Sequence, residues 1–201
     1  MELRRAVPDD AQALSTLSAA CFTQTFGHLY PPQDLSHFLD EAYAVAAWAS
    51  LLSDPAYATW LLESDGIAIG YATAGACTLP HADVAPGDGE LKRLYVLQEH
   101  QGGGRGSRLF DAALAWLLRD GPRTLWIGVW SGNLGAQRFY ARRGFERVGD
   151  YDFDSSRFVS QGFGQGGLNG ETVLAPLDDD YDAMRRDIWI GMSHYSDVLS
   201  K

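Results

Sequence analysis

Three things are scarce in this sequence: cysteine, positive charge and long apolar runs. The two cysteines, Cys21 and Cys77, do not form a CxxC pair, so the sequence has no such redox or zinc motif. The N-terminal residues lack the apolar stretch of a signal peptide, and no run is long enough to cross a bilayer. From these absences we expect reduced, mostly structural thiols, no membrane partner and a cytoplasmic location.

The shortage of positive charge argues against a nucleic-acid partner. The sequence has 16 Lys and Arg against 26 Asp and Glu, a formal net charge of -10. A duplex would meet net repulsion, and no concentrated basic patch is evident. An acidic surface attracts cationic amines, although such a surface more often serves solubility alone.

The overall composition is that of an ordinary globular protein. Hydrophobic residues make up 46% of the sequence and charged residues 21%, which is typical of a soluble domain. A length of 201 residues suits a single domain, so we expect one domain over residues 1–201. Within it we expect a glycine-rich loop insertion at 155–179, because Gly162, Gly164, Gly166, Gly167 and Gly170 oppose regular structure there.

Strand-like and helix-like patterns follow one another along the chain. Alternating apolar residues predict strands, and apolar residues three and four apart predict helices. The turn Ser64-Asp65-Gly66 separates two strand-like runs and predicts a hairpin. The expected strands are residues 3–6, 60–63, 67–72, 90–96, 125–129, 146–153 and 181–190, and the expected helices are residues 11–26, 35–48, 105–117 and a short one between 133 and 144. The result is a mixed α/β fold.

A glycine-rich turn, Gln101-Gly102-Gly103-Gly104-Arg105-Gly106-Ser107, lies between a predicted strand and a predicted helix. Glycine lets a backbone approach a phosphate closely, and the N–H groups at a helix start have no intrahelical partner. The turn is not a Walker A loop, because no lysine precedes Ser107, and it is not GxGxxG, because position 107 is not glycine. By itself such a cluster fits a flexible surface turn equally well.

Gln101, Gly104 and Gly106 fall in an order that resembles the cofactor motif of the GNAT superfamily of N-acetyltransferases: Arg or Gln, two residues, Gly, one residue, then Gly or Ala. The resemblance extends to the preceding strand, 94–96, and to the downstream run 133–145. It implies a mixed, mostly antiparallel central sheet flanked by helices. It also implies transfer of an acetyl group from acetyl-CoA to a primary amine without a metal.

The resemblance also assigns the residues that bind the co-substrate. Backbone groups of Leu94 and Val96 would pair with the pantetheine arm of acetyl-CoA, with Tyr95 between them and Asn133 near the same arm. Amides of the glycine-rich turn would hold the pyrophosphate, and Arg105 and Arg108 would add positive charge. The complete set is Leu94, Tyr95, Val96, Gln101, Gly102, Gly103, Gly104, Arg105, Gly106, Ser107 and Asn133.

Two residues are candidates for proton transfer. Tyr140 occupies the position from which a general acid of this family would protonate the departing CoA thiolate. The same sequence pattern also fits a tyrosine that packs in the core beside Phe139 and Phe145. Glu90, at the start of its strand, is the first candidate for the base that deprotonates the amine, and pairing with Lys92 is the alternative. His28, His81 and His100 are weaker candidates.

The sequence does not identify the amine that accepts the acetyl group. The run 23–30, followed by Leu35, Phe38 and Leu39, looks like the substrate-side helices of bacterial polyamine-type GNAT enzymes, but aromatic residues at helical spacing more often pack a core. A small amine and a peptide N-terminal or lysine amine all fit, and a homodimer is left open. A non-catalytic acyl-CoA-binding sensor is the alternative function. Nucleotide binding is disfavoured by the missing lysine and by the lack of a recognisable magnesium-binding motif.

Overall fold

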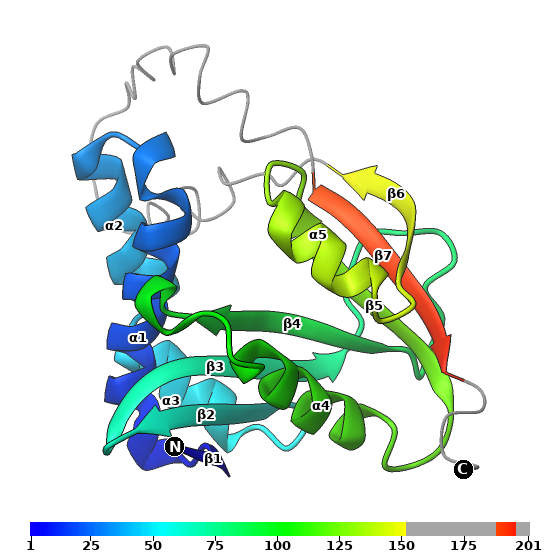
Figure 1. Cartoon of the computed structure of the whole chain (residues 1–201), viewed down its shortest axis with the longest axis horizontal. Coiled ribbons are helices and arrows are strands. Elements are labelled where there is room, and N and C mark those ends of the chain that lie inside the picture. The colour runs from blue at the N-terminus through cyan, green and yellow to red at the C-terminus, as the bar shows by residue number, and fades with distance from the viewer. Residues whose placement is uncertain (152–187, 196–201) are drawn as a thin grey trace, which may run out of the picture.

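The computed structural model describes residues 1–151 and 188–195, which form one sheet with helices on both faces (Figure 1). The strands are β1 (Glu2–Arg5), β2 (Ala58–Ser64), β3 (Ile67–Ala76), β4 (Gly89–Val96), β5 (Arg123–Trp130), β6 (Glu146–Tyr151) and β7 (Ile188–Tyr195). Their order across the sheet is β1-β2-β3-β4-β5-β7-β6. Only the β4–β5 pair is parallel, so the predicted mixed, mostly antiparallel sheet is confirmed.

Five α-helices lie within the described residues: α1 (Ala11–Phe26), α2 (Pro32–Ala42), α3 (Val45–Ser53), α4 (Arg105–Leu117) and α5 (Leu134–Ala141). Short 3-10 helices precede α1 (Pro8–Asp10), follow it (Gly27–Leu29) and follow β4 (Gln98–His100). Helices α4 and α5 pack on one face of the sheet, where Leu109, Phe110 and Tyr140 join the largest buried cluster. Helices α1 and α3 cover the other face through a second cluster that includes Leu14 and Trp48 (Figure 1). The strands therefore carry apolar side chains on both faces.

The predicted hairpin between β2 and β3 is confirmed, and its turn explains why. Asp65 has φ 53° and Gly66 has φ 79°, so both central residues adopt the left-handed conformation. A two-residue turn with two positive φ angles matches the twist of a hairpin, and an Asp-Gly pair favours it. The local sequence is thus sufficient to set this connection.

The prediction of one helix over 35–48 is wrong, because the structure has α2 and α3 with a break between them. Tyr43 ends α2, and Ala44 adopts an extended conformation with φ -50° and ψ 140°. The break lets Trp48 bury itself against α1, where its indole N–H donates to the Ser18 hydroxyl at 3.1 Å. Apolar residues continue at helical spacing across the break, so the sequence pattern does not reveal it.

The last strand extends beyond its predicted end. The structure places β7 at Ile188–Tyr195, between β5 and β6, whereas the predicted strand is 181–190. In the sequence the charged run 185–187 interrupts the pattern, and Ile188, Ile190 and Met192 then alternate. The predicted loop insertion at 155–179 lies outside the described residues, as do 152–153 and 181–187. Within the described ranges, no helix combines the length and apolarity needed to span a membrane.

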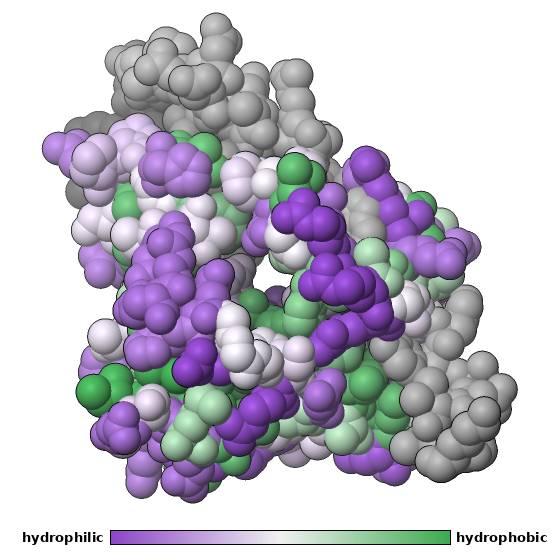
Figure 2. Space-filling view, in the orientation of Figure 1, coloured by the Kyte–Doolittle hydropathy of each residue, from purple (hydrophilic) through white to green (hydrophobic). Residues whose placement is uncertain are grey.

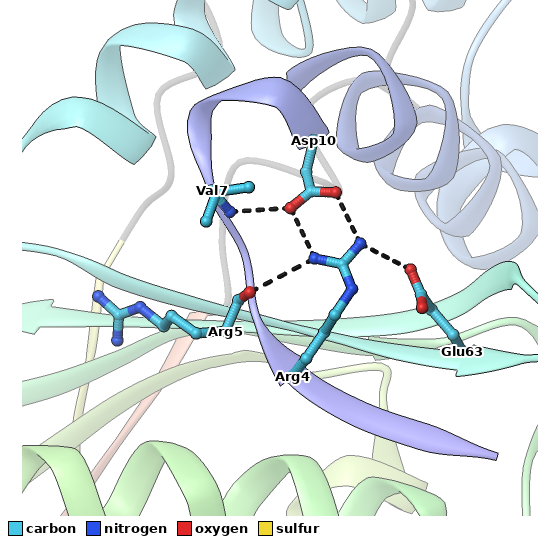
Figure 3. A network of polar contacts seen from close by, with 5 residues as sticks. All are labelled: Arg4, Arg5, Val7, Asp10 and Glu63. Carbon is cyan, nitrogen blue, oxygen red and sulfur yellow. Dashed lines mark hydrogen bonds and ion pairs between the residues drawn. The ribbon is translucent and has the colours of Figure 1, made fainter.

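Arg4 ties the first strand to the start of α1 and to the edge of β2. Its guanidinium donates to both carboxylate oxygens of Asp10, at 2.7 and 2.8 Å, and to Glu63 at 2.8 Å. Asp10 also accepts the backbone N–H of Val7 at 2.8 Å. Figure 3 shows Arg4 reaching between the two carboxylates. These hydrogen bonds, chiefly those from Arg4, hold the pKa of Asp10 below its usual value.

We expect Asp10→Asn to lower the free energy of unfolding by about 1–2 kcal/mol at neutral pH, because Asn cannot offer two charged acceptors to Arg4. The lowered pKa means that the Asp10 contribution is present above the ordinary Asp pKa of about 4 and is lost as the pH falls through the lowered value. Urea unfolding at pH 7 and in acid measures both effects. Asp9→Asn, an exposed neighbour with the same charge change, is the control. Equal losses in the two variants would contradict the role of the network.

Candidate active site

The parallel strands β4 and β5 separate after three paired residues. Pairing runs from Gly89 with Leu125 to Leu91 with Ile127, and then β4 continues to Val96 and β5 to Trp130 without pairing further with each other. A cleft of about 460 Å³ opens beside the free end of β4, and we call it the glycine-turn cleft. Its lining comes from β4 (Leu94, Tyr95, Val96), from the turn and first residues of α4 (Gln101, Gly102, Gly104, Arg105, Gly106, Ser107), from α5 and its flanks (Asn133, Gly135, Ala136, Phe139, Tyr140, Arg142) and from Thr25.

Figure 2 shows this side of the molecule hollowed between α1 and α5, with hydrophilic residues along much of the rim and apolar residues at depth. Ten of the eleven residues expected to bind the co-substrate line the glycine-turn cleft, and Gly103 lies between two of them in the chain. The structure therefore brings that predicted set together.

The glycine turn depends on backbone angles that only glycine adopts easily. Gly102, Gly103 and Gly104 have φ angles of 82°, 59° and 76°, and Gly104 is the residue before α4. Gly104 offers no side-chain cap, and the first amides of a helix have no intrahelical acceptor. The N–H groups of Gly106 and Ser107 are thus available at the positive end of the α4 dipole, which suits an anion such as phosphate.

Two amides of the turn are already engaged. The N–H of Gln101 donates to the carbonyl of Gln98 at 3.1 Å, and the N–H of Arg105 donates to the carbonyl of Gly102 at 3.3 Å. Arg105 lines the cleft, its Nη1 donates to the Gly102 carbonyl at 3.4 Å, and its Nε is buried without a hydrogen-bond partner among the described residues. A buried guanidinium N–H without an acceptor is costly unless a ligand supplies one. This donor adds a second reason to expect an anion here.

The end of β4 offers a free backbone edge to the same cleft. In an antiparallel pair, alternate residues turn both backbone groups towards the same neighbour. Leu97 N–H donates to Ile69 on the β3 side, so Tyr95 also faces β3, whereas Leu94 and Val96 face the gap left by β5. Gln101 Nε2 donates a hydrogen bond to the Val96 carbonyl oxygen at 3.1 Å. The remaining groups of Leu94 and Val96 can pair with an extended ligand.

Tyr140 reaches the cleft from α5, a helix whose ends were predicted correctly. Asn133 Oδ1 accepts the N–H of Ala136 at 3.0 Å at the start of α5, and Gly144, with φ 82°, follows its end. Tyr140 is 7% exposed and packs against Phe110 and Phe145. Burial raises the pKa of Tyr140, and the neighbouring Tyr95 raises it further. Tyr140 is thus both a core residue and a protonated phenol at the cleft.

A second cavity of about 480 Å³ lies on the α1 side of the sheet, and we call it the aromatic pocket. Its apolar lining comes from α1, α2, α3, β4, β5 and the segments that connect the elements: Phe22, Phe26, Tyr30, Phe38, Ala42, Tyr43, Leu51, Tyr57, Leu79, Tyr95 and Trp130, with Thr73 of β3 and Gly128 of β5. Its charged lining is Glu90, Lys92 and Arg93. Tyr95 lines both cavities, so both adjoin this residue in the part of β4 that no longer pairs with β5.

A β-bulge in β4 explains how three charged residues face one pocket. Thr73 pairs with Arg93 and Ala74 pairs with Leu91, so Lys92 is an extra residue in the ladder. Strict alternation would turn Lys92 and Arg93 to opposite faces. With the bulge, both line the aromatic pocket together with Glu90, while Leu91 joins the core on the other face.

Glu90 is buried, and its hydrogen bonds converge on a single carboxylate oxygen. Oε2 accepts from the Thr78 N–H at 2.9 Å, the Thr78 hydroxyl at 3.3 Å and the Lys92 ammonium at 2.8 Å. Oε1 has no hydrogen bond to any described residue. Pairing with Lys92, the alternative weighed from the sequence, is therefore present. It leaves one oxygen of Glu90 free to meet a ligand or a water.

The three histidines considered as weaker candidates for the base lie outside both cavity linings. His28 and His100 belong to the short helices after α1 and β4. His81 packs its ring against Trp126, with 5.2 Å between centroids. None gathers with other Cys, Asp or Glu residues into a metal-binding group in the part of the chain that is described.

Sequence reasoning missed Arg93 and Trp130, which line the aromatic pocket. Arg93 lies over the rings of Tyr43 and Trp48, at 5.9 and 5.0 Å. Trp130 contacts Phe26 of α1 edge to face, with 5.5 Å between centroids. No local signal points to either residue, because the bulge and the packing of α1 over β5 bring them to the pocket.

Comparison with known proteins gives one consistent family. The sequence profile of the acetyltransferase (GNAT) family matches residues 13–145, a span that includes the glycine turn and Tyr140. An N-acetyltransferase of Mycobacterium tuberculosis is 33% identical over 144 residues, covering 72% of this chain and 88% of that protein. An N-acetyltransferase of Lactobacillus delbrueckii subsp. lactis is 28% identical over 144 residues, covering 72% of this chain and 83% of that protein.

Solved structures share the fold at low sequence identity. The PaiA N-acetyltransferase of Thermoplasma acidophilum, in complex with coenzyme A, gives a TM-score of 0.67 at 16% identity, covering 96% of this chain and 98% of that one. The ribosomal-protein-S18-alanine N-acetyltransferase of Escherichia coli gives a TM-score of 0.62 at 17% identity, covering 100% and 97%. These similarities extend the agreement from sequence to architecture.

Proposed function

Because the chain belongs to the acetyltransferase (GNAT) family, we propose that it transfers an acetyl group from acetyl-CoA to a primary amine. Acetyl-CoA occupies the glycine-turn cleft, and the amine occupies the aromatic pocket. The observation that carries this proposal is that Tyr95, in the part of β4 that no longer pairs with β5, lines both cavities. Two substrates entering from opposite faces of the sheet would meet there.

The residues of the glycine-turn cleft fit the chemical groups of acetyl-CoA. The amides of Gly106 and Ser107 and the partnerless Arg105 Nε suit a pyrophosphate. The free backbone groups of Leu94 and Val96 suit the amide-bearing pantetheine arm. Asn133 lines the same cleft, although its side-chain oxygen already caps α5. All eleven residues thus remain our assignment for co-substrate binding.

Acetyl-CoA supplies an activated thioester, and the amine attacks it directly. The chain contributes mainly proximity and orientation, by holding the two substrates at the junction of the cavities. Glu90, through its free Oε1 and directly or through a water, accepts a proton from the amine. Tyr140 donates its phenolic proton to the departing thiolate, and its raised pKa keeps that proton in place at neutral pH.

Amine-dependent release of CoA tests this function. Acetyl-CoA binding is measured by calorimetry, and release of the free thiol is followed with a panel of small amines and peptides. An acetyltransferase binds acetyl-CoA and releases CoA faster with an amine. Binding without any amine-dependent release would favour the acyl-CoA-binding sensor, and displacement of CoA by ATP at equal concentration would favour a nucleotide site.

We expect Glu90→Gln to lower kcat by about tenfold to a hundredfold, with acetyl-CoA affinity unchanged, because the variant cannot take up the proton of the amine. The loss in kcat is limited because part of the amine substrate is already unprotonated at alkaline pH and needs no base. Steady-state kinetics and calorimetry measure the two quantities.

Glu63→Gln is the matched control for Glu90→Gln, since Glu63 is also a partly buried, ion-paired carboxylate of the sheet but lies outside both cavities. Its kcat should equal that of the parent chain. If Glu90→Gln lowers thermal stability but leaves kcat unchanged, Glu90 serves the structure through Thr78 and Lys92 and is not the base.

A further inference from the structure

The charged side chains of the aromatic pocket do not balance one another. Glu90 and Lys92 form a close ion pair at 2.8 Å, so their charges cancel. Arg93, brought to the pocket by the bulge at Lys92, has no carboxylate partner among the described residues. The other polar side chains of the pocket are the phenols of Tyr30, Tyr43, Tyr57 and Tyr95 and the hydroxyl of Thr73, none of which is a carboxylate or an ammonium. The described lining therefore carries one positive charge.

Arg93 lies over two aromatic rings. Its guanidinium carbon is 5.0 Å from the centroid of Trp48 and 5.9 Å from that of Tyr43. An arginine held against aromatic faces keeps the N–H groups in its own plane free for hydrogen bonding. A planar fork of this kind matches a carboxylate in a bidentate contact.

We propose that the acceptor is a primary amine that carries a carboxylate and an apolar or aromatic body, the chemistry of an aromatic amino acid, and that Arg93 binds the carboxylate. This inference rests on the proposed function, since it assumes that the aromatic pocket holds the acceptor. The carboxylate pairs with Arg93, and the body packs among Phe22, Phe26, Phe38 and Trp130. The amine then lies towards Glu90 and the junction at Tyr95.

The same charge balance disfavours polyamines, which the sequence resemblance of the first helices had suggested. A polyamine brings two or more positive charges into a half-buried pocket whose described lining is already cationic. Like charges in a region of low dielectric repel, and desolvation of each ammonium adds to the cost. A zwitterionic amine instead neutralises Arg93.

The test compares L-phenylalanine with phenethylamine, which differ only by the carboxylate, and with spermidine. With the parent chain we expect kcat/KM for phenylalanine to exceed that for phenethylamine by about tenfold or more. Arg93→Met should remove this preference by raising KM for phenylalanine about tenfold to a hundredfold, with little change for phenethylamine. Arg93→Lys, which keeps the charge but not the fork, should fall between.

Arg119→Met is the control, because Arg119 also lies over a tryptophan ring, at 3.8 Å from Trp116, but outside both cavities. It should leave both kinetic constants unchanged. The proposal is overturned if the parent chain acetylates phenethylamine or spermidine with a kcat/KM equal to that for phenylalanine. It is also overturned if Arg93→Met lowers kcat/KM equally for the two aromatic amines. If acetyl-CoA binds but no amine of the panel releases CoA, the proposed function itself has failed.

Discussion

Replacing Gly104 with valine should weaken acetyl-CoA binding by about a hundredfold. Gly104 has φ 76°, a conformation that costs an ordinary L-residue about 1–2 kcal/mol and a β-branched residue more. No described atom lies within 4 Å of a Cβ built at this position, so the valine side chain would enter the glycine-turn cleft rather than clash with the protein. It would then stand between the phosphates and the first amides of α4.

Calorimetry with acetyl-CoA measures this loss, and Gly66→Val separates it from backbone strain. Gly66 has nearly the same φ, 79°, also has open space around a built Cβ, and lies in the β2–β3 turn outside the cleft. Both variants should lose some stability in urea unfolding, but only Gly104→Val should lose affinity. Full affinity in a correctly folded Gly104→Val chain would remove the glycine turn from phosphate binding.

The features that sequence predicts well are those fixed by local chemistry. The hairpin follows from Asp65-Gly66, α5 from its Asn133 cap and its closing Gly144, and the glycine turn from consecutive residues that tolerate positive φ. Each of these signals acts within a few residues of chain. The order and spacing of the motifs are therefore enough to assign the glycine turn and Tyr140 to one site.

The features that sequence misses depend on contacts between distant elements. The break at Ala44 is set by the burial of Trp48 against Ser18 of α1, and the surrounding apolar spacing conceals it. The bulge at Lys92 inserts a residue without any change in composition, so alternation assigns Arg93 to the wrong face. The aromatic pocket is consequently visible only in the structure, whereas much of the glycine-turn cleft could be predicted.

The burial of Tyr140 changes the acidity of its phenol. A phenol in water is a weak acid with a pKa of about 10, and burial among Phe110, Phe139 and Phe145 raises the value further. Such a group is fully protonated throughout the working range and gives up its proton only to a strong base. A thiolate in water is a weaker base than a phenolate, so proton transfer from Tyr140 requires that the cleft raise the pKa of the departing thiol as well.

Tyr140→Phe should therefore lower kcat by roughly a hundredfold to a thousandfold while leaving acetyl-CoA affinity and the free energy of unfolding nearly unchanged. The ring that packs against Phe110 and Phe145 is kept, and only the hydroxyl at the cleft is lost. Single-turnover release of CoA with a saturating amine measures the chemical step, and calorimetry measures binding.

Phe139→Leu, a change at the neighbouring cleft residue that removes an aromatic ring but no proton donor, is the control. A role in packing alone would give the larger stability loss in Phe139→Leu and an unchanged rate in Tyr140→Phe, and that outcome would remove Tyr140 from proton transfer. A loss of rate confined to Tyr140→Phe would assign the departing proton to its hydroxyl.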